Sequence, residues 1–493
     1  MRSERSSVRP ESSALRMLER FDPVWLAGLG SLVLSIIAIL GVVTVGRDGA
    51  FYLDLARQAG EHDLAGVQSR FDWPWYPLLL AGTHALLRLP LEYCAYLWSI
   101  LFAAGTCALM VDLVRQRAPQ AAYWACWIVL AMPAVNQFRG DIIRESGFWF
   151  FCTLALWLAM RWQARGGWGL AASVWVAIGL GSLFRLEAVL VGGCVLLWQL
   201  PALWTAGQRR RFAQIAWLPA LTVIVGVAVL AGWGALDARR LDYYLELVRP
   251  AGLFGAFTQL SHQFADSLTN KYSANEAGRI IFIGLSGALL IKCVSLMGPG
   301  ALAFLDRRTW AACSRYWREY RVLALTASLY LVVLMVFFIR AQFMNSRYLS
   351  LLVLLLVPLL AMALHAFHRA HPRLGKLLAL VGVLVMLANV ISLGARKTHY
   401  VEAGHWISAH TPAQAPIFYE DGRIGYYAGR GYELSDLTRE AAMGPALAGS
   451  YRYFVIEAER DEPWLEAWLH EHRLQVLASF ANRKGDTVLV LGP

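Results

Sequence analysis

The chain has 493 residues, of which 58% are hydrophobic and only 16% are charged. A soluble protein of this length would carry far more charge on its surface, so the composition excludes an ordinary soluble protein. The net charge of +11 suits basic residues concentrated in cytoplasmic loops, and no nucleic-acid partner is expected.

Eleven apolar segments are long enough to cross a bilayer as helices, and they predict a mainly α-helical, polytopic transmembrane bundle. The predicted spans are 24–45, 91–113, 120–137, 145–160, 168–184, 188–204, 213–233, 278–304, 322–339, 346–364 and 377–394. A shorter apolar stretch, 75–89, follows a proline-rich start and contains His84 and Arg88. We expect it to be an interfacial or re-entrant helix within a first outer loop, 46–90.

Basic residues orient these spans. With eleven spans, six basic clusters fall on one side, which the positive-inside rule assigns to the cytoplasm. They are the N-terminus, Arg115 with Arg117, Arg161 with Arg165, Arg209 to Arg211, Arg307 to Arg321, and Arg369 to Lys376. The loop 46–90, the turn 138–144, the loop 234–277 and all residues after 394 are then extracytoplasmic.

The tail has a different pattern, which predicts two domains: a transmembrane module over 1–394 and a small extracytoplasmic α/β domain over 395–493. Strands are expected at 416–419, 423–427, 453–456 and 487–491. A helix is expected over 462–472 and a hairpin turn over 482–486. The tail also carries Tyr419 to Asp421 and Tyr426 with Tyr427, which suit either contact with an acceptor or ordinary strand packing.

Charged residues gather at the predicted outer ends of the spans. Two are the carboxylates Asp48 and Asp141, and the others are Arg139, Arg144, Arg185, Glu187 and Arg347, which precedes Tyr348. Any one of them alone could be an ordinary solvated charge at a helix end. Together they suit substitution at a phosphate leaving group, because a carboxylate can deprotonate the attacking group and guanidinium groups can neutralise the phosphate.

The chain resembles the GT-C superfamily of membrane glycosyltransferases, and is most similar to lipid A aminoarabinose transferases and protein O-mannosyltransferases of the dolichyl-phosphate-mannose mannosyltransferase-like family. The resemblance lies in the long first outer loop, the number of spans, the outer C-terminal domain and four short motifs. The motifs are Arg47 to Tyr52, Asp72 to Pro77, Arg139 to Asp141 and Ser346 to Leu349.

The resemblance implies an enzyme that transfers a sugar from a polyprenyl-phosphate carrier to an extracytoplasmic lipid, glycan or protein acceptor, with inversion. It implies that Asp48 is the catalytic base and that Asp141 supports it or orients the acceptor. Candidate residues for the donor phosphate are Arg347, Arg185, Arg139 and Arg144. Further candidates for substrate contact are Tyr348, Tyr76, His84 and Glu187.

Two departures from the resemblance limit it. Gly49 follows Asp48 where many relatives carry a second acid, so no metal site or cofactor is predicted, although a divalent-metal requirement is left open. The Lys-Pro-Pro of the aminoarabinose transferases is replaced by Trp73-Pro74-Trp75, which leaves the sugar open.

The expected location is a bacterial inner membrane, among membrane lipids, with the N-terminus in the cytoplasm and the C-terminal domain in the periplasm. The alternative functions are an envelope transporter, a flippase and a ligase-type membrane protein. Transporters usually place ionisable residues near the bilayer midplane and contain repeated halves. Here the charges gather at span ends and the halves do not resemble each other, which favours the transferase.

Overall fold

The computed structural model describes residues 21–205, 207–233, 249–391, 396–433, 437–459 and 462–493. The basic N-terminus, residues 1–20, and residues 234–248 of the predicted outer loop 234–277 lie outside these residues. The chain divides into two compact units. The first comprises Met1–Leu34, Leu101–Gln137 and Gly147–Asn389, and the second Ser35–Ile100, Phe138–Ser146 and Val390–Pro493. The predicted domain boundary at 394 stays a prediction.

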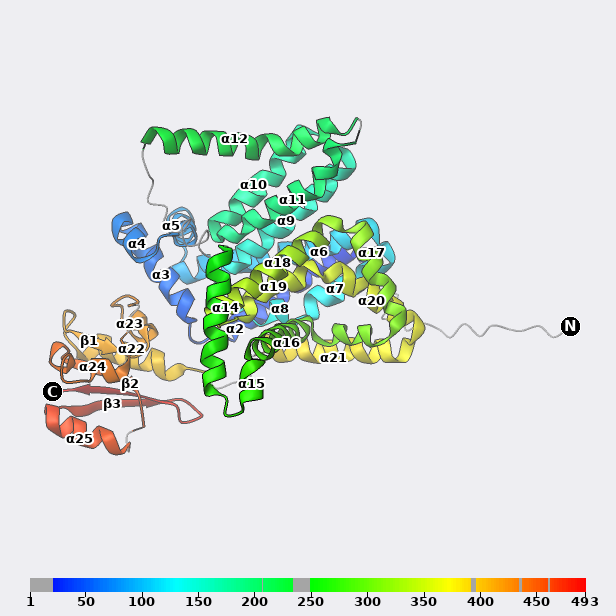
Figure 1. Ribbon diagram of the computed structural model, residues 1–493. Helices are drawn as coiled ribbons and strands as arrows, with labels where there is room; N and C mark the ends of the chain where they lie inside the picture. Colours follow the sequence, from blue (N-terminus) through cyan, green and yellow to red (C-terminus); the bar gives the residue numbers. More distant parts are fainter. Residues whose placement is uncertain (1–20, 206, 234–248, 392–395, 434–436, 460–461) are drawn as a thin grey trace. The chain divides into compact units, whose positions relative to one another are not determined.

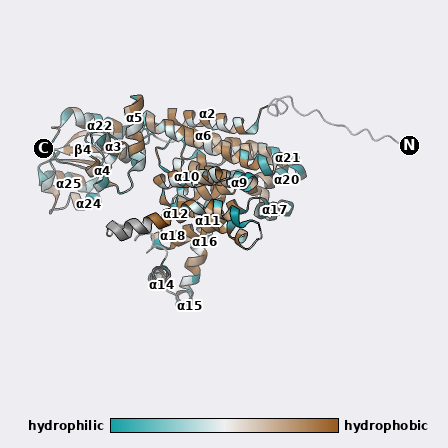
Figure 2. Ribbon diagram, turned by 90° about the horizontal axis from the view of Figure 1, so that it is seen from above, coloured by the Kyte–Doolittle hydropathy of each residue, from teal (hydrophilic) through white to brown (hydrophobic). Residues whose placement is uncertain are grey.

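Helices outside the first outer loop and the C-terminal segment make up most of the chain, and most of the long ones are apolar (Figures 1 and 2). In chain order they are α2 Pro23–Leu40, α6 Leu91–Arg117, α7 Ala122–Ala131, α8 Pro133–Asn136, α9 Glu145–Arg165, α10 Trp168–Phe184, α11 Val189–Gln199, α12 Arg209–Trp233, α14 Pro250–Ser267, α15 Lys271–Asn275, α16 Ala277–Met297, α17 Ala311–Glu319, α18 Arg321–Ala341, α19 Ser346–Leu355, α20 Val357–Ala370 and α21 Pro372–Val390. Within the described residues, six helices are long and apolar enough to cross a membrane, or seven with one bent pair. The count of eleven spans therefore stays a prediction.

Two predicted spans are interrupted at prolines. The segment 120–137 is split into α7 and α8, because Met132, before Pro133, has the extended ψ of 135° that proline imposes on its neighbour. The segment 346–364 is α19 and α20, which meet at an angle of 62° near Pro358. Proline lacks the N–H that would continue the helical hydrogen bonds, so each of these two predicted spans is divided between two helices.

The predicted first outer loop folds into three helices of the second unit: α3 Arg47–Gly60, α4 Leu64–Arg70 and α5 Trp75–Leu87. Helix α3 packs against α5 through aromatic side chains. The rings of Tyr52 and Tyr76 meet edge to face with their centres 5.4 Å apart. Helix α5 ends at Arg88, which adopts the left-handed conformation (φ 55°) of a helix C-cap.

The C-terminal segment, residues 396–493, contains a four-stranded sheet of order β1-β2-β4-β3 among its described residues. The strands are β1 Ile417–Tyr419, β2 Tyr453–Glu457, β3 Gln475–Ala481 and β4 Thr487–Gly492. β1 and β2 are parallel, whereas β2 with β4 and β4 with β3 are antiparallel. The α/β character of this segment and the strands at 416–419, 453–456 and 487–491 are thus confirmed, whereas β3 was not among the predicted strands.

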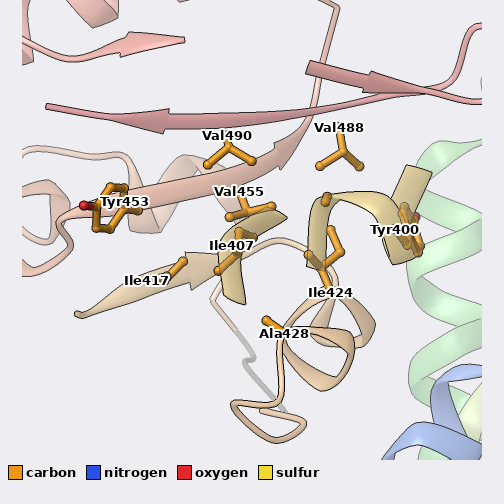
Figure 3. Close-up of a cluster of buried hydrophobic side chains, with 10 residues drawn as sticks. Tyr400, Ile407, Ile417, Ile424, Ala428, Tyr453, Val455, Val488 and Val490 are labelled. Atoms are coloured by element: carbon orange, nitrogen blue, oxygen red, sulfur yellow. The ribbon is translucent and has the colours of Figure 1, made fainter. Parts of the chain in front are cut away.

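Apolar side chains cover both faces of this sheet. On one face, Ile407 of α22 (Thr398–His410) and Ile424 of α23 (Gly422–Tyr427) pack with Val455 and Val490 (Figure 3). On the other, Leu465 of α25 (Pro463–His472) packs against Phe454 and other apolar residues of the sheet. The short helix α24 spans Arg439–Ala442.

The predicted hairpin turn and helix of the tail are confirmed. The side-chain oxygen of Asn482 accepts hydrogen bonds from the amides of Lys484 at 2.8 Å and Asp486 at 3.1 Å. Gly485 has a φ of +92°, which glycine adopts without strain. Helix α25 matches the expected helix over 462–472.

The strand expected at 423–427 is instead helix α23. Asp421 caps this helix by accepting a hydrogen bond from the amide of Arg423 at 3.0 Å. Three consecutive residues, Arg423 to Gly425, are buried, whereas a strand with one buried face would bury alternate residues. The local cap therefore prevails over the β-propensity of the isoleucine and two tyrosines that suggested a strand.

Candidate functional site

Asp48 lies in the first turn of α3, and its side chain is half-buried. A carboxylate at this position interacts favourably with the helix dipole and the exposed amides of the first turn. The residue that precedes the helix, Gly46, has an extended backbone. Asp48 is therefore presented where the helix begins, directly after an extended residue.

Asp141 lies beside this segment. It closes a tight turn in which its amide donates a hydrogen bond to the carbonyl oxygen of Phe138 at 3.1 Å. A Cβ atom on Gly46 would lie 3.9 Å from Oδ1 of Asp141, and a Cβ atom on Gly49 would lie 3.0 Å from Cβ of Ile142. The structure thus brings together the two segments that carry the predicted catalytic carboxylates.

The absence of a side chain at position 49 follows from this packing. A Cβ atom there would also lie 2.7 Å from Cγ1 of Val45, closer than real Cβ contacts allow. Gly49 is buried between Val45 and the 141–142 turn. Glycine is therefore required for the close approach that places the segment of Asp141 against the start of α3.

The arginines flanking Asp141 have different surroundings. Arg139 is buried, and its Nη1 donates to the hydroxyl oxygen of Ser35 on α2 at 2.9 Å. The guanidinium carbon of Arg144 lies 5.3 Å from the centre of the Phe71 ring. Nε and Nη1 of Arg144 are buried and have no hydrogen-bond partner among the described residues. Nε and Nη1 of Arg144 can therefore donate hydrogen bonds to an anionic ligand. Arg139 instead anchors the 138–141 turn to α2.

The C-terminal segment contacts the start of α3 through a buried carboxylate. Oδ2 of Asp421 accepts hydrogen bonds from Nε of Arg47 at 3.1 Å and from Nη2 at 2.9 Å. Arg423 donates from Nε to Oδ1 at 2.8 Å and from Nη2 to Oδ2 at 2.7 Å. Burial alone would raise the pKa of the Asp421 carboxyl, but the hydrogen bonds and charge of Arg423, together with the charge of Arg47, lower it to about 2.

Two further hydrogen bonds join this segment to the residues that precede Asp48. The amide of Val45 donates to the hydroxyl oxygen of Tyr427 at 2.8 Å. The hydroxyl of Thr44 donates to the carbonyl oxygen of Lys397 at 2.8 Å. Tyr427, which the sequence left open between acceptor contact and packing, thus holds the polypeptide leading into α3.

Asp54, one and a half turns after Asp48, is a buried carboxylate that sequence reasoning missed. It accepts hydrogen bonds from Arg57 at 2.8 Å, Gln58 at 3.2 Å and Arg70 at 2.8 Å. Burial raises the pKa of Asp54, but the hydrogen bonds from Arg57 and Arg70 outweigh this and lower it. The only signal in the sequence is an acid on the otherwise apolar face of an amphipathic helix.

A cavity of about 700 Å³ opens beside Asp54. Its lining residues come from α3, α4 and the C-terminal segment, and are Asp54, Arg57, Gln58, Arg70, Arg430, Gly431, Tyr432, Glu433, Leu437 and Tyr451. A Cβ atom on Gly431, whose φ is +87°, would lie 3.2 Å from Oδ1 of Asp54. Glycine at this position therefore lets the backbone of the C-terminal segment approach the Asp54 carboxylate.

Two further predicted substrate contacts, Tyr76 and His84, lie on α5. The Tyr76 ring is buried against Tyr52. His84 is exposed, and its Nδ1 lies 2.6 Å from the carbonyl oxygen of Leu89 just beyond the helix. The contacts of both residues are accounted for by the folding of α5, and a role in substrate binding stays a prediction.

The remaining predicted residues form a cluster in the first unit. Arg185 caps the C-terminus of α10, and its Nη2 lies 2.5 Å from Oε1 of Glu187. The guanidinium carbon of Arg185 lies 4.8 Å from the centre of the Tyr348 ring, and that of Arg347 lies 5.6 Å from the same ring. The structure therefore groups Arg185, Glu187, Arg347 and Tyr348 as two cations around one aromatic ring and one acid.

Neighbouring residues fix this cluster. A Cβ atom on Gly147 would lie 2.3 Å from Cε1 of Phe184, so glycine lets α9 approach the last residue of α10, next to Arg185. At the start of α19, the side-chain oxygen of Asn345 accepts a hydrogen bond from the amide of Arg347 at 3.2 Å. The hydroxyl of Tyr330 donates to the carbonyl oxygen of Tyr348 at 3.0 Å.

Lys292 is a second residue that sequence reasoning missed. It lies within the long apolar helix α16, and its ammonium donates to the carbonyl oxygen of Met344, three residues before Arg347. A charged side chain within an apolar span is costly and usually marks function. Apart from Arg279 at its edge, Lys292 is the only charged residue in the predicted segment 278–304, and this was the signal available in the sequence.

No group of three or more His, Cys, Asp or Glu side chains that could hold a metal ion occurs within the described parts of the chain. Comparisons with known proteins found no matching protein-family model and no matching curated protein sequence. Solved structures, in contrast, match over most of the chain.

The crystal structure of apo ArnT from Cupriavidus metallidurans matches with a TM-score of 0.60 and 14% sequence identity, over 97% of this chain and 98% of ArnT. The Archaeoglobus fulgidus oligosaccharyltransferase in the apo form matches with a TM-score of 0.54 and 12% identity, over 89% of this chain and 70% of that one. The same enzyme tethered to an acceptor peptide containing the NVT sequon matches with a TM-score of 0.51 and 11% identity, over 94% of this chain and 74% of that one. The predicted fold class is confirmed.

Proposed function

We propose that this chain, which has the GT-C fold, is an integral-membrane glycosyltransferase that moves a sugar from a polyprenyl-phosphate carrier to an extracytoplasmic acceptor. The observation that carries the proposal is the packing of the Asp141 turn against the start of α3, with the Asp141 carboxylate beside Gly46 and Asp48 two residues further on. Two carboxylates on adjoining segments suit activation and orientation of one acceptor group.

The proposed acceptor chemistry assigns the base to Asp48. As an ionised carboxylate it takes the proton of the acceptor hydroxyl while the hydroxyl oxygen attacks the anomeric carbon of the sugar. Asp141 orients the acceptor or supports Asp48. Arg144, with buried guanidinium nitrogens that have no hydrogen-bond partner among the described residues, supplies a cation in the same unit.

The proposed donor chemistry uses Arg185 and Arg347. As the bond between the anomeric carbon and the phosphate oxygen breaks, negative charge grows on the departing polyprenyl phosphate. Guanidinium groups stabilise such charge through hydrogen bonds and electrostatics. A phosphate is already a good leaving group, so no acid is needed to protonate it. Attack from the side opposite the phosphate inverts the anomeric centre. The products are the glycosylated acceptor, the polyprenyl phosphate and Asp48 in its protonated form.

Lys292 and Glu187 have supporting roles in this proposal. The Lys292 ammonium holds the backbone at Met344, and the Asn345 side chain then caps the helix that carries Arg347. Glu187 pairs with Arg185, which fixes the direction of that guanidinium.

The proposed location is a bacterial inner membrane with the C-terminal segment in the periplasm, because the six basic clusters follow the positive-inside rule. The acceptor class is a lipid such as lipid A, another envelope glycan or a protein. The similar archaeal oligosaccharyltransferase structure holds a tethered acceptor peptide, which supports a protein among these acceptor classes.

Mass spectrometry of envelope glycolipids and glycoproteins, with and without the gene, tests this function. We expect one sugar modification to disappear on deletion, a polyprenyl-phosphate-linked form of the same sugar to accumulate, and both changes to reverse on complementation. An unchanged set of glycans, with no lipid-linked sugar accumulating, would contradict the proposal. A transported solute that accumulates in place of a lipid-linked sugar would favour the transporter alternative.

A further inference from the structure

We infer that the C-terminal segment positions Asp48, and that Asp421 is the positioning residue through which it does so. The inference rests on the proposed role of Asp48 as the base. The C-terminal segment would thus contribute to catalysis without contacting the substrate. Asp421 and Arg47 are 374 residues apart in the sequence, so the sequence gives no indication of this contact.

The first step is the geometry of Asp421. Its side chain has 0% exposure and is held by Arg423 through two side-chain hydrogen bonds and one backbone hydrogen bond. Oδ2 additionally accepts the two hydrogen bonds from Nε and Nη2 of Arg47, whose side chain is 65% exposed. A rigid, buried acceptor thus holds an otherwise solvated arginine. Since Arg47 is the residue immediately before Asp48, the contact fixes the first turn of α3.

The second step is that independent contacts lie on both sides of Asp48. Tyr427 accepts a hydrogen bond from the amide of Val45, three residues before Asp48. Six residues after Asp48, Asp54 lies against Gly431, and Arg70 joins Asp54 to the carbonyl oxygen of Tyr432. The C-terminal segment therefore holds the peptide leading into α3 and the second turn of that helix. A single surface ion pair would stabilise little, but this set defines the helix position.

The position of a catalytic base affects the rate of proton abstraction. Proton abstraction requires the carboxylate within about 3 Å of the acceptor hydroxyl, and a displacement of about 1 Å can cost about 100-fold in rate. The hydroxyl is the group whose attack forms the new bond, so a displaced Asp48 lowers kcat. Donor binding, which the proposal assigns to Arg185 and Arg347, should keep its KM.

One alternative is that Arg47 itself contacts the donor phosphate. A double-mutant cycle separates the two roles, because residues that act through one contact have non-additive effects. Arg47→Gln removes the arginine but leaves the Asp421–Arg423 pair intact, so it tests the contact without leaving a buried charge alone. Asp421→Asn keeps the side-chain oxygen that caps α23, because asparagine is as good a cap as aspartate.

The experiment uses the full-length protein in lipid nanodiscs, with hydrogen–deuterium exchange of the peptide covering residues 44–52. Glu420→Gln is the matched control, because Glu420 contacts the amide of Glu457 and the side chain of Arg439, both within the C-terminal segment. We expect Arg47→Gln and Asp421→Asn each to raise exchange in 44–52 by about tenfold, as loss of a charge-assisted hydrogen bond would, and the double variant to raise it no further.

Transfer rates in membranes, measured with the lipid-linked donor extracted from a deletion strain, give the second readout. We expect kcat to fall about tenfold in each single variant and in the double variant, with the donor KM unchanged. Unchanged exchange in Arg47→Gln, which leaves the Asp421–Arg423 pair in place, would overturn the inference. Additive losses, or a raised donor KM in Arg47→Gln, would overturn it in favour of direct phosphate contact. If the wild-type protein transfers no sugar but both variants raise exchange in residues 44–52, the proposed function is refuted. The contact between Asp421 and Arg47 would still be supported.

Discussion

The guanidinium carbon of Arg185 lies 4.8 Å from the centre of the Tyr348 ring, where α10 ends and α19 begins. Arg347, the residue immediately before Tyr348, brings a second guanidinium to 5.6 Å from the same ring. Cations over an aromatic face are held at a defined distance without neutralising their charge. Tyr348 therefore brings the two proposed phosphate-binding arginines to one aromatic ring.

Replacing either arginine should weaken donor binding. We expect Arg347→Ala and Arg185→Ala each to raise the donor KM at least about tenfold, because each loses charge-assisted hydrogen bonds to the phosphate. The acceptor KM should not change. Initial rates over separate donor and acceptor concentration series measure both values. Arg279→Ala, at an exposed arginine of α16, is the control. An unchanged donor KM in both variants would remove the assignment.

Lys292→Met should weaken the same site indirectly. The substitution keeps the apolar stem but removes the ammonium that satisfies the Met344 carbonyl. Leaving that carbonyl without the ammonium costs about 1–3 kcal/mol and should loosen the start of α19, which carries Arg347. We expect a lower melting temperature and a raised donor KM. Lys292→Arg should recover part of both, because it restores a donor. Equal donor KM values for Lys292→Met and the wild-type protein would show that Lys292 does not support Arg347.

Gly49→Ala should displace the start of α3. The added Cβ would lie 2.7 Å from Val45 and 3.0 Å from Ile142, so the packing of the Asp141 turn must change. Overpacking of this kind costs about 1–3 kcal/mol. We expect reduced thermal stability and reduced transfer. Gly60→Ala, at the end of the same helix and with no atom within 4 Å of the added Cβ, is the matched control and should behave as wild type.

The Asp421 carboxylate should make stability depend on pH in the acid range. Its folded-state pKa of about 2 lies below the ordinary value of 3.8, so its contribution is fully present above pH 4 and is lost as the pH falls towards 2. The shift corresponds to about 2 kcal/mol. In detergent-solubilised protein, we expect Asp421→Asn to melt at a lower temperature than wild type at pH 7. The difference should shrink between pH 4 and pH 2. A difference independent of pH would contradict the ionised pair.

Much of the fold follows from local sequence pattern. Apolar runs of span length locate the helices, and the short runs of β-branched and aromatic residues at 416–419, 453–456 and 487–491 locate three strands, because both signals depend on neighbouring residues alone. Strand β3 lacks that regularity. It contains a β-bulge between Val476 and Ala478 and lies at the sheet edge, so its inward and outward residues do not alternate cleanly.

The candidate site was predictable only in part, for a physical reason. Asp48, Asp141 and Arg347 stand out because charges at the ends of apolar segments are visible locally. The partners that hold them are not. Asp421 reaches Arg47 across 374 residues, and Lys292 reaches Met344 through tertiary packing of α16 against α19. Such contacts are set by how the elements pack, and no local pattern encodes them.

The role of Asp48 as the base is the central claim, and the rate of sugar transfer by Asp48→Asn in membranes tests it most directly. Asparagine has nearly the same shape but cannot accept the proton of the acceptor, so we expect a loss of at least about 100-fold in kcat with unchanged folding and donor binding. Asp63→Asn is the matched control, because Asp63 caps α4 in the same predicted outer loop and asparagine caps equally well. Wild-type transfer rates in Asp48→Asn would contradict the claim.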